Sequence, residues 1–273
     1  MIFNTLTIAG VDPSGGAGIL ADVKTMSALG TYACAVIAAL TAQNTKGVTG
    51  VQPVAPDFVR QQIDTLFADV HIDSVKIGML GQEQVTRMVA ERLAYWMPDH
   101  IVLDPVMVAK SGDVLLDKQA ISTLREALIP LSTVITPNLP EAGVLLGERE
   151  ADSLKEMYRV AEKLRKLMDH HRTVWVLLKG GHLPGSETID LLTDGDRMIE
   201  MPGKRIDTPN THGTGCTLSA ALCALIPGTG DVPEAAKLAK SYIETAIARA
   251  GELNVGHGHG PVHHFHALWS GNA

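Results

Sequence analysis

The stretch TLTIAGVDPSGGAGILADVKTMSAL, residues 5–29, has the order of a strand, a glycine-rich loop and a helix. Its first residues, Thr5–Ala9, are mostly apolar or β-branched, which is typical of a strand. The loop lacks the Gly-Lys-Ser/Thr of a Walker A loop, and alanine at position 21 breaks the GxGxxG fingerprint. We expect the loop over residues 10–18 to face a ligand at the end of the strand, with a simple capped turn as the alternative.

Strands and helices alternate along the rest of the chain. The predicted strands are Thr5–Ala9, Ala33–Leu40, Ser74–Ile77, Ile101–Leu103, Val134–Thr136 and Val174–Leu178, with a hairpin of Ile189–Leu192 and Met198–Met201 around Asp194 and Gly195. The predicted helices are Ala17–Leu29, Pro56–Ala68, Gln82–Trp96, Lys118–Leu128, Pro140–Leu146, Ser153–Met168, Gly215–Leu225 and Val232–Ala250. This alternation predicts an α/β fold whose mostly parallel sheet is covered by helices on both faces, with ligands at the carboxyl ends of its strands. We expect one domain over residues 1–273, ending in a tail rich in histidine and glycine over residues 255–273.

Composition excludes several classes of protein. The 273 residues carry a formal net charge of −7 and no basic cluster, which argues against a nucleic-acid binder. No apolar run reaches the roughly 20 residues that a membrane span requires, and the residues before the first strand lack the pattern of a secretory signal. The three cysteines form no CxxC pair and predict no disulfide framework. We therefore expect a cytoplasmic protein with reduced thiols.

The stretch NTHGTGC, residues 210–216, carries the strongest functional signal. Gly213 and Gly215 let the backbone approach a ligand and turn its N–H groups inward. A helix that opens at Gly215 or Cys216 presents unpaired N–H donors, with Thr214 beside them, to phosphate or developing negative charge. The same dipole predicts a lowered pKa for Cys216, a candidate base in phosphoryl transfer to an alcohol. The alternative is a tight loop before a buried, inert cysteine.

Two further strand ends carry residues suited to a flat heterocycle. Gln43 follows the second predicted strand, and its amide can pair with the donors and acceptors of such a ring. Met79 lies between two glycines after the third strand, where its polarizable side chain can contact a ring face. The alternatives are a turn capped by Asn44 and a methionine that fills the core.

Acidic and basic residues follow three more strands. Asp104 and Glu141 come after neighbouring predicted strands, and a pair of carboxylates suits Mg²⁺, which keeps several waters. Lys179 ends another strand and can reach a triphosphate. The alternatives are a strand-end cap, a helix N-terminal acid and a solvated lysine.

The remaining cysteines and histidines receive structural interpretations. Cys34 and Cys223 are expected to pack in the core. Five of the eleven histidines lie in the tail, where the spacing fits no standard metal site. We expect the tail to pack near the active site and His212 to be a hydrogen-bonding loop residue.

Seven segments together closely resemble one protein family. They are AGVDPSGGAG (9–18), TAQNT (41–45), KIGML (76–80), LDPVM (103–107), TPNLPEA (136–142), KGGH (179–182) and THGTGCT (211–217). The family is the hydroxymethylpyrimidine/phosphomethylpyrimidine kinases of thiamine biosynthesis, in the ribokinase-like superfamily. The resemblance implies a three-layer sandwich, a homo-oligomer, and two ATP-dependent steps: phosphorylation of the hydroxymethylpyrimidine, then of its monophosphate.

The resemblance also implies roles for individual residues. Gln43 would recognise the aminopyrimidine, in a pocket lined by Gly10, Asp22, Met79 and Val106. The anion hole and base would be Gly213, Thr214, Gly215 and Cys216. The nucleotide would contact Asn138, Lys179 and Thr211, and Mg²⁺ would be held by Asp104 and Glu141.

Three alternative functions remain open from the sequence. Sugar kinases of the superfamily have aspartate at the position of Cys216, whereas some pyridoxal kinases share the cysteine. A pyridoxal kinase is therefore the nearest alternative. The others are a cysteine acyltransferase with Cys216 as nucleophile and a non-catalytic vitamin sensor.

Overall fold

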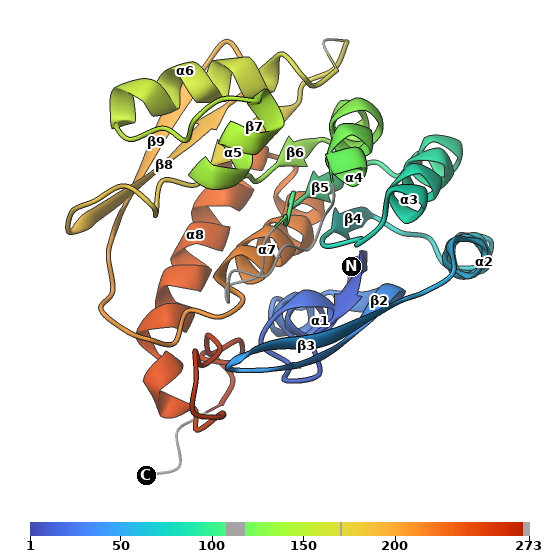
Figure 1. Ribbon diagram of the computed structural model, residues 1–273, viewed down its shortest axis with the longest axis horizontal. Coiled ribbons are helices and arrows are strands. Elements are labelled where there is room, and N and C mark those ends of the chain that lie inside the picture. Colours follow the sequence, from blue (N-terminus) through green and yellow to red (C-terminus); the bar gives the residue numbers. More distant parts are fainter. Residues whose placement is uncertain (108–117, 170, 270–273) are drawn as a thin grey trace.

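A computed structural model describes residues 1–107, 118–169 and 171–269, and its centre is a nine-stranded sheet (Figure 1). The strands are β1 (Asn4–Val11), β2 (Tyr32–Asn44), β3 (Gly47–Pro53), β4 (Ser74–Ile77), β5 (Ile101–Leu103), β6 (Val134–Ile135), β7 (Trp175–Leu178), β8 (Glu187–Thr193) and β9 (Met198–Lys204). Their order is β3-β2-β1-β4-β5-β6-β7-β8-β9. Strands β2 to β7 in this order are parallel, and β3, β8 and β9 are antiparallel to their neighbours.

The predicted mostly parallel sheet is confirmed, and so is the hairpin of β8 and β9. Strand β3 is absent from the prediction. Its sequence, GVTGVQP, contains two glycines and a proline, so it offers no continuous apolar run. It forms all the same because it lies at the edge of the sheet and needs only one partner, the extended β2.

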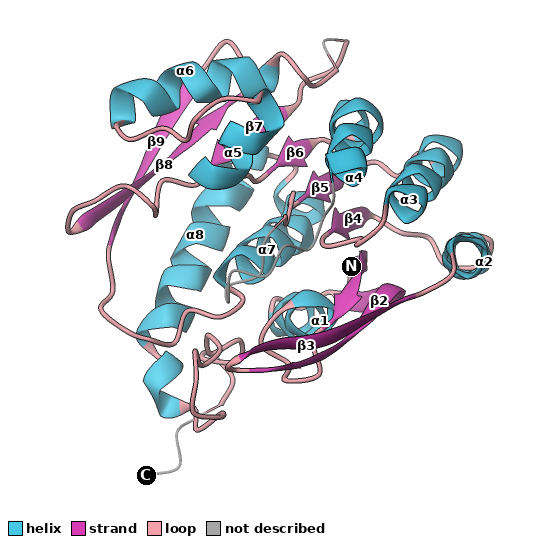
Figure 2. Cartoon of the chain, in the orientation of Figure 1, coloured by secondary structure: helices cyan, strands magenta, loops and turns pink. Residues whose placement is uncertain are grey.

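Helices cover both faces of the sheet, as Figure 2 shows with the strands between two helical layers. One layer contains α1 (Gly18–Ala28), α7 (Thr214–Thr229) and α8 (Val232–Ala248). The other contains α2 (Pro56–Phe67), α3 (Glu83–Trp96), α4 (Lys118–Thr123), α5 (Leu139–Leu146) and α6 (Leu154–Arg165). The helix predicted to reach Leu128 continues beyond α4 as a π-helical turn, Leu124–Leu128. Within the described residues, no helix is long and apolar enough to cross a membrane.

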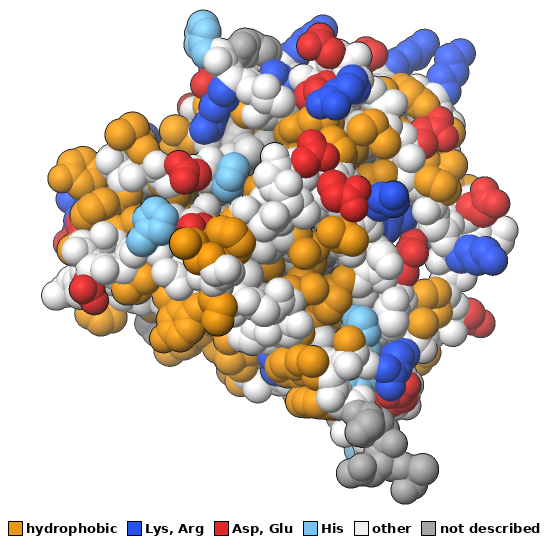
Figure 3. All heavy atoms as spheres, turned by 180° about the vertical axis from the view of Figure 1, so that it is seen from behind, with side chains coloured by type: hydrophobic (Ala, Val, Ile, Leu, Met, Phe, Trp, Pro, Cys, Tyr) orange, Lys and Arg blue, Asp and Glu red, His pale blue; other side chains and the backbone are white. Residues whose placement is uncertain are grey.

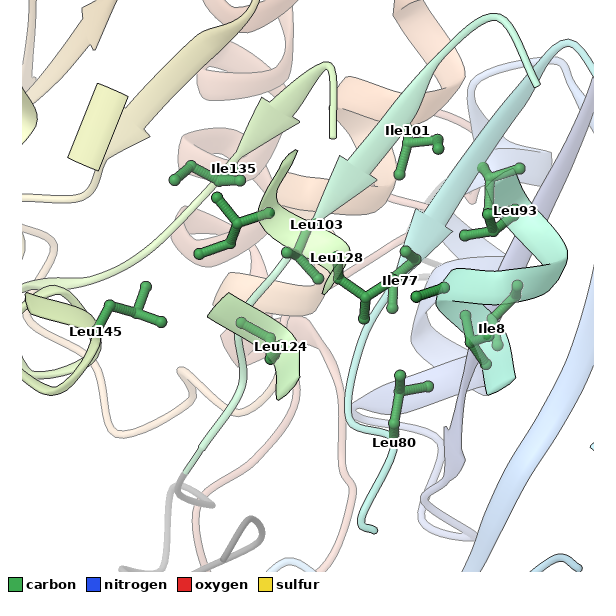
Figure 4. Close-up of a cluster of buried hydrophobic side chains, with 14 of the residues drawn as sticks. Ile8, Ile77, Leu80, Leu93, Ile101, Leu103, Leu124, Leu128, Ile135 and Leu145 are labelled. Atoms are coloured by element: carbon green, nitrogen blue, oxygen red, sulfur yellow. The ribbon is translucent and has the colours of Figure 1, made fainter. Parts of the chain in front are cut away.

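Each helical layer has its own apolar core against the sheet. In Figure 4, Ile8, Ile77, Leu103 and Ile135 project from four neighbouring strands toward Leu93 and Leu128 of the covering helices. These side chains are 0–1% exposed, so the central strands bury apolar side chains against this helical layer. On the opposite face, small residues of α7 such as Ala220 and Ala221 are fully buried against the sheet.

Strand order reverses between β1 and β4. From β1 the chain first builds outward through β2 and β3, and then returns to add β4 to β9 on the other side. In open parallel sheets a crevice forms at this reversal, beyond the carboxyl ends of the strands. The loops that follow β1, β4 and β5 meet there.

Candidate active site

A cavity of about 790 Å³ lies at this reversal point. Every site residue predicted from the sequence lines it except Asp22. Each lies on a loop or element end that the parallel strands bring to one edge of the sheet. A volume of this size is at the upper end for a small-molecule site and accommodates two ligands side by side.

The anion hole predicted from NTHGTGC is formed by the start of α7. Gly213 has φ of 79° and precedes the helix, and a Cβ atom at this position would lie 1.7 Å from the Gly16 carbonyl oxygen. Only glycine fits this close approach of two loops. The helix therefore begins at Thr214, and the first-turn residues Thr214, Gly215 and Cys216 line the cavity.

The prediction that the pKa of Cys216 is lowered is wrong. Cys216 is half-buried in the cavity wall, and desolvation raises the pKa of its thiol to about 11. The charge of Lys76 and the N–H of Gly18 act in the opposite direction, while the carboxylates of Asp22 and Asp104 add to the rise. The helix N-terminus alone does not compensate for burial beside two acids.

Asp22 does not line the cavity, although the resemblance places it in the pocket wall. It lies behind the cavity wall, where it forms a fully buried ion pair with Lys76. The ammonium of Lys76 is 3.0 and 2.8 Å from the two carboxylate oxygens, and the Thr7 hydroxyl donates to Oδ2 at 2.6 Å. These three contacts hold the Asp22 carboxylate away from the cavity.

Lys76 itself is a cavity residue that sequence reasoning missed. Burial alone would lower its pKa, but the neighbouring groups Asp22, Cys216 and Asp104 raise it, so the amine stays protonated. A signal was present, because a lysine inside the apolar strand Ser74–Ile77 has no solvent-facing side to occupy.

Two acids and one lysine meet at the ends of β5, β6 and β7. The Lys179 ammonium lies 3.1 Å from Asp104 Oδ1 and 3.9 Å from Glu141 Oε2. Asp104 is 1% exposed and also accepts hydrogen bonds from the Thr136 and Ser219 hydroxyls, at 3.0 and 3.4 Å.

The two acids have opposite ionisation behaviour. Desolvation raises the pKa of Glu141 to about 7, and the charge of Asp104 contributes to the rise. Desolvation also opposes ionisation of Asp104, but the ammonium groups of Lys179 and Lys76 hold its pKa below the usual range. One carboxyl of this pair is ionised and the other is partly protonated. A bound cation would favour the ionised form of both, so the pair is suited to bind a cation.

Asn138 and Glu141 also cap α5. The Asn138 Oδ1 accepts the Glu141 N–H, and Glu141 Oε2 accepts the Asn138 N–H, both at 2.8 Å. This reciprocal capping box fixes both side chains at the cavity wall. The position of Glu141 is therefore set by the start of its own helix.

The opposite side of the cavity contains the residues expected to contact a heterocycle. Gln43 lies near the end of β2, where the Thr41 hydroxyl donates to its Oε1 at 3.1 Å. Gly10, Met79 and Val106 also line this region. The part of the cavity beyond Lys179, which sequence reasoning missed, includes Asp190 and Lys240, paired at 2.7 Å.

His212 and the two remaining cysteines have structural roles. The His212 ring is 2.7 Å from Asp12 Oδ2, as expected for a hydrogen-bonding loop residue. Cys34 and Cys223 are buried, as expected. Across residues 1–107, 118–169 and 171–269, no cluster of three or more His, Cys, Asp or Glu residues is arranged to hold a metal ion.

Comparisons with known proteins identify the family of the chain. A family profile described as phosphomethylpyrimidine kinase matches residues 12–263. The chain is 52% identical over 268 residues to the hydroxymethylpyrimidine/phosphomethylpyrimidine kinase of Escherichia coli, covering 97% of this chain and 98% of that protein. It is 44% identical to the thiamine biosynthesis bifunctional protein ThiED of Geobacter sulfurreducens, covering 96% of this chain and 52% of that protein.

A solved structure is similar over the whole chain. It is an ADP complex of Bacillus subtilis pyridoxal kinase, with a TM-score of 0.89 and 34% identity, covering 99% of this chain and all of that one. The backbone therefore matches that of a kinase whose named substrate is a different heteroaromatic ring.

Proposed function

This chain belongs to the phosphomethylpyrimidine kinase family, and on that premise we propose the reaction that its cavity supports. The enzyme transfers the γ-phosphoryl group of ATP to the hydroxymethyl oxygen of 4-amino-5-hydroxymethyl-2-methylpyrimidine. It then phosphorylates the resulting monophosphate to the diphosphate, for thiamine biosynthesis. Membership of this kinase family argues against the two alternative functions from other classes, a cysteine acyltransferase and a non-catalytic sensor.

One observation carries the proposal. The first turn of α7, with Cys216, lines a single cavity between the Gln43 region and the Lys179 region. An acceptor beside Gln43 and a triphosphate beside Lys179 would both reach this turn. Phosphoryl transfer depends mainly on such positioning and on charge stabilisation.

The acceptor is proposed to bind beside β1, β2 and β4. The Gln43 amide offers both a donor and an acceptor, which matches the amino group and ring nitrogen of an aminopyrimidine. Gly10, Met79 and Val106 line the same region and would contact the ring faces. The Thr41 hydroxyl orients the Gln43 amide.

The donor is proposed to bind across the start of α7. The N–H groups of Gly213, Thr214 and Gly215 would stabilise the charge that develops on the transferring group. Lys179, Asn138 and Thr211 would contact the nucleotide phosphates. The nucleoside would extend toward Ile243 and Ile247, which line the far part of the cavity.

Asp104 and Glu141 are proposed to hold Mg²⁺. Their oxygens fit this hard cation, and the raised pKa of Glu141 shows that the site lacks positive charge at that carboxyl. When bound, Mg²⁺ neutralises phosphate charge. Lys179 contacts both acids and offsets part of their negative charge.

Cys216 is proposed to take the proton of the acceptor hydroxyl as the new P–O bond forms. A thiol with a pKa of about 11 must first lose its own proton. Bringing that pKa to about 7 requires roughly 5 kcal/mol of stabilisation of the thiolate. Lys76 and the N–H of Gly18 favour the thiolate, and so does the N-terminus of α7.

A coupled assay of ADP release with three rival acceptors tests the function. We expect turnover with hydroxymethylpyrimidine and with its monophosphate, at a kcat/KM well above that for pyridoxal. Cys216→Ala serves as the control for contaminating kinases. A higher kcat/KM for pyridoxal would contradict the proposed substrate, and ADP release independent of any acceptor would contradict the transfer.

The assembly and surroundings of the enzyme are also proposals. We propose a single kinase domain that forms a homo-oligomer in the cytoplasm and binds only small molecules. The three cysteines are unpaired, which suits a reducing compartment. On the face shown in Figure 3, acidic and basic side chains are interspersed, which is unlike a nucleic-acid-binding surface.

A further inference from the structure

The C-terminal segment, residues Gly256–His266, lies beside the end of the β2–β3 hairpin (Figure 1). Gly260 to His264 are buried, although the segment contains no long helix or strand. Besides α8, it contacts three separate parts of the chain, each of which lies at or next to the active-site cavity. The proposed reaction assigns no chemical step to any residue of this segment.

The first contact is with Thr45, in the turn between β2 and β3. The Gly258 N–H donates to Thr45 Oγ1 at 3.1 Å, and the His259 N–H donates to the Thr45 carbonyl at 2.8 Å. A Cβ atom on residue 258 would lie 2.1 Å from that carbonyl oxygen. Thr45 follows Gln43 by two residues, so this contact fixes the end of the strand that presents the Gln43 amide.

The second contact is with His212, in the loop before α7. The His212 N–H donates to the Gly260 carbonyl at 3.0 Å, and the Val262 N–H donates to the His212 carbonyl at 3.4 Å. The His212 ring in turn contacts Asp12 of the glycine-rich loop at 2.7 Å. The segment therefore supports both loops that meet at the anion hole.

The third contact is with Thr217, in the first turn of α7. The His264 Nε2 is 3.2 Å from Thr217 Oγ1, and the two residues are 4% and 0% exposed. The His264 carbonyl accepts the Tyr242 hydroxyl of α8, and the His263 N–H donates to the Ala246 carbonyl of the same helix at 2.9 Å. These bonds to α8 anchor the ring that supports the residue next to Cys216.

We infer that the C-terminal segment is a positioning element of the active site. Its contact with Thr45 places Gln43 against the acceptor, and its contact through His264 places the first turn of α7 against the transferring group. A displacement of about 1 Å at reacting groups can cost 10²-fold in rate. The inference rests on the proposed function only for its kinetic readout.

The Thr45 contact is tested with Thr45→Val and Thr45→Ser. Valine keeps the shape of the side chain but removes the acceptor of the Gly258 N–H, and serine keeps the hydroxyl. We expect Thr45→Val to raise the KM for the pyrimidine about tenfold, with the KM for ATP within twofold of wild type. Thr45→Ser should restore the pyrimidine KM.

The His264 contact is tested with Thr217→Val, His264→Leu and the double variant. Each single change should lower kcat about tenfold and leave both KM values near wild type. The double variant should be no slower than the single ones, because both remove the same bond. His257→Ala, an exposed histidine of the same segment, is the matched control and should match wild type.

Amide hydrogen exchange provides a readout that needs no substrate. We expect faster exchange at residues 43–46 in Thr45→Val and at residues 212–217 in His264→Leu, with unchanged exchange in the β4 and β5 strands. If the wild type does not phosphorylate the pyrimidine, the proposed function fails and the exchange result still decides the positioning role. Unchanged exchange at both sites, or equal losses of kcat and of both substrate affinities in every variant, would overturn the inference.

Discussion

The ammonium group of Lys76 donates to both carboxylate oxygens of Asp22, and neither side chain is exposed to solvent. A buried ion pair of this kind is often no more stable than well-packed apolar residues of the same volume. Its position at the cavity wall near Cys216 therefore points to an electrostatic role. Among the neighbouring groups that lower the pKa of the Cys216 thiol, Lys76 has the largest effect.

Lys76→Met should make the Cys216 thiol harder to ionise. Loss of the positive charge should raise the thiol pKa by roughly one unit or more, so that alkylation by iodoacetamide at pH 8.5 slows about tenfold. The alkylation rate of Cys216, followed by mass spectrometry from pH 7 to 10, measures this shift.

Two further variants separate charge from packing. Lys76→Arg keeps the charge and should alkylate at nearly the wild-type rate. Because Lys76→Met leaves Asp22 buried and unpaired, the double change Lys76→Met and Asp22→Leu removes both charges and restores folding stability. Equal alkylation profiles for wild type and both methionine variants would rule out the role of Lys76.

Cys216→Ala should reduce kcat by roughly 10²–10⁴-fold, the usual contribution of a positioned general base. ADP affinity, measured by calorimetry, should stay near wild type because the N–H groups of α7 remain in place. Cys34→Ala is the matched control, since Cys34 is buried in β2 outside the cavity. Wild-type turnover by Cys216→Ala would remove the base assignment.

Gln43→Leu should weaken pyrimidine binding while ATP binding is retained. A lost hydrogen bond that leaves ligand groups unpaired costs about 1–3 kcal/mol, so the pyrimidine KM should rise roughly 10- to 100-fold. Gln52→Leu changes an exposed amide on the neighbouring strand and should leave both KM values unchanged. A pyrimidine KM equal to that of wild type in Gln43→Leu would refute the recognition role.

Glu141→Gln should raise the Mg²⁺ concentration needed for half-maximal activity. The effect should exceed the roughly tenfold loss caused by removing a supporting partner of a metal ligand. Since the pKa of Glu141 is raised to about 7, protons compete with the cation below that pH, and wild-type Mg²⁺ affinity should increase from pH 6 to pH 8. Glu148→Gln, at an exposed acid near the end of α5, is the control.

The pH dependence itself distinguishes the role of Glu141. In Glu141→Gln the increase in Mg²⁺ affinity between pH 6 and pH 8 should disappear, because the titrating group is gone. The measurement is a Mg²⁺ titration of activity at each pH. An unchanged pH dependence would place the metal elsewhere.

Acid should destabilise the protein through its buried tail histidines. Desolvation lowers the pKa of His264 to about 3, from about 6.5 in the unfolded chain, so the unfolded state binds the extra proton between these values. Stability is therefore complete above pH 6.5 and is lost as the pH falls toward 3, by about 1.4 kcal/mol per unit. Desolvation also lowers the pKa of His263 and His266.

His264→Gln should reduce this loss. Between pH 7 and pH 5 the free energy of unfolding should fall by about 2 kcal/mol less in the variant than in wild type. Glu141 titrates in the same range with the opposite sign, but it is common to both proteins and cancels in the difference. Urea unfolding at the two pH values gives the comparison, and parallel losses would contradict it.

The sequence predicted the architecture well because the central strands are rich in apolar and β-branched residues. The same regularity located the strand ends, after which the cavity residues Gln43, Met79 and Lys179 lie. It could not predict β3, whose pairing depends on the long β2 beside it. The family resemblance placed Asp22 in the pocket wall, and the sequence did not reveal its buried partner Lys76, which lies 54 positions away.

The error about Cys216 has a different origin. A helix N-terminus is visible in the sequence, whereas desolvation and the nearness of Asp22 and Asp104 depend on three-dimensional packing. The local signal was interpreted correctly as a helix start, but the larger contribution came from residues far away in the chain. The part of the cavity beyond Lys179 escaped prediction for the same reason.

The bond between Asp12 and His212 joins positions that are 200 residues apart. A ribosome adds roughly 5–20 residues per second, so the first loop waits roughly 10–40 s for its counterpart to be synthesised. Throughout that interval the nascent chain can form its early strands, but the loop of Asp12 cannot yet contact the loop of His212. The two loops can therefore meet only after α7 and the segment after α8 have left the exit tunnel.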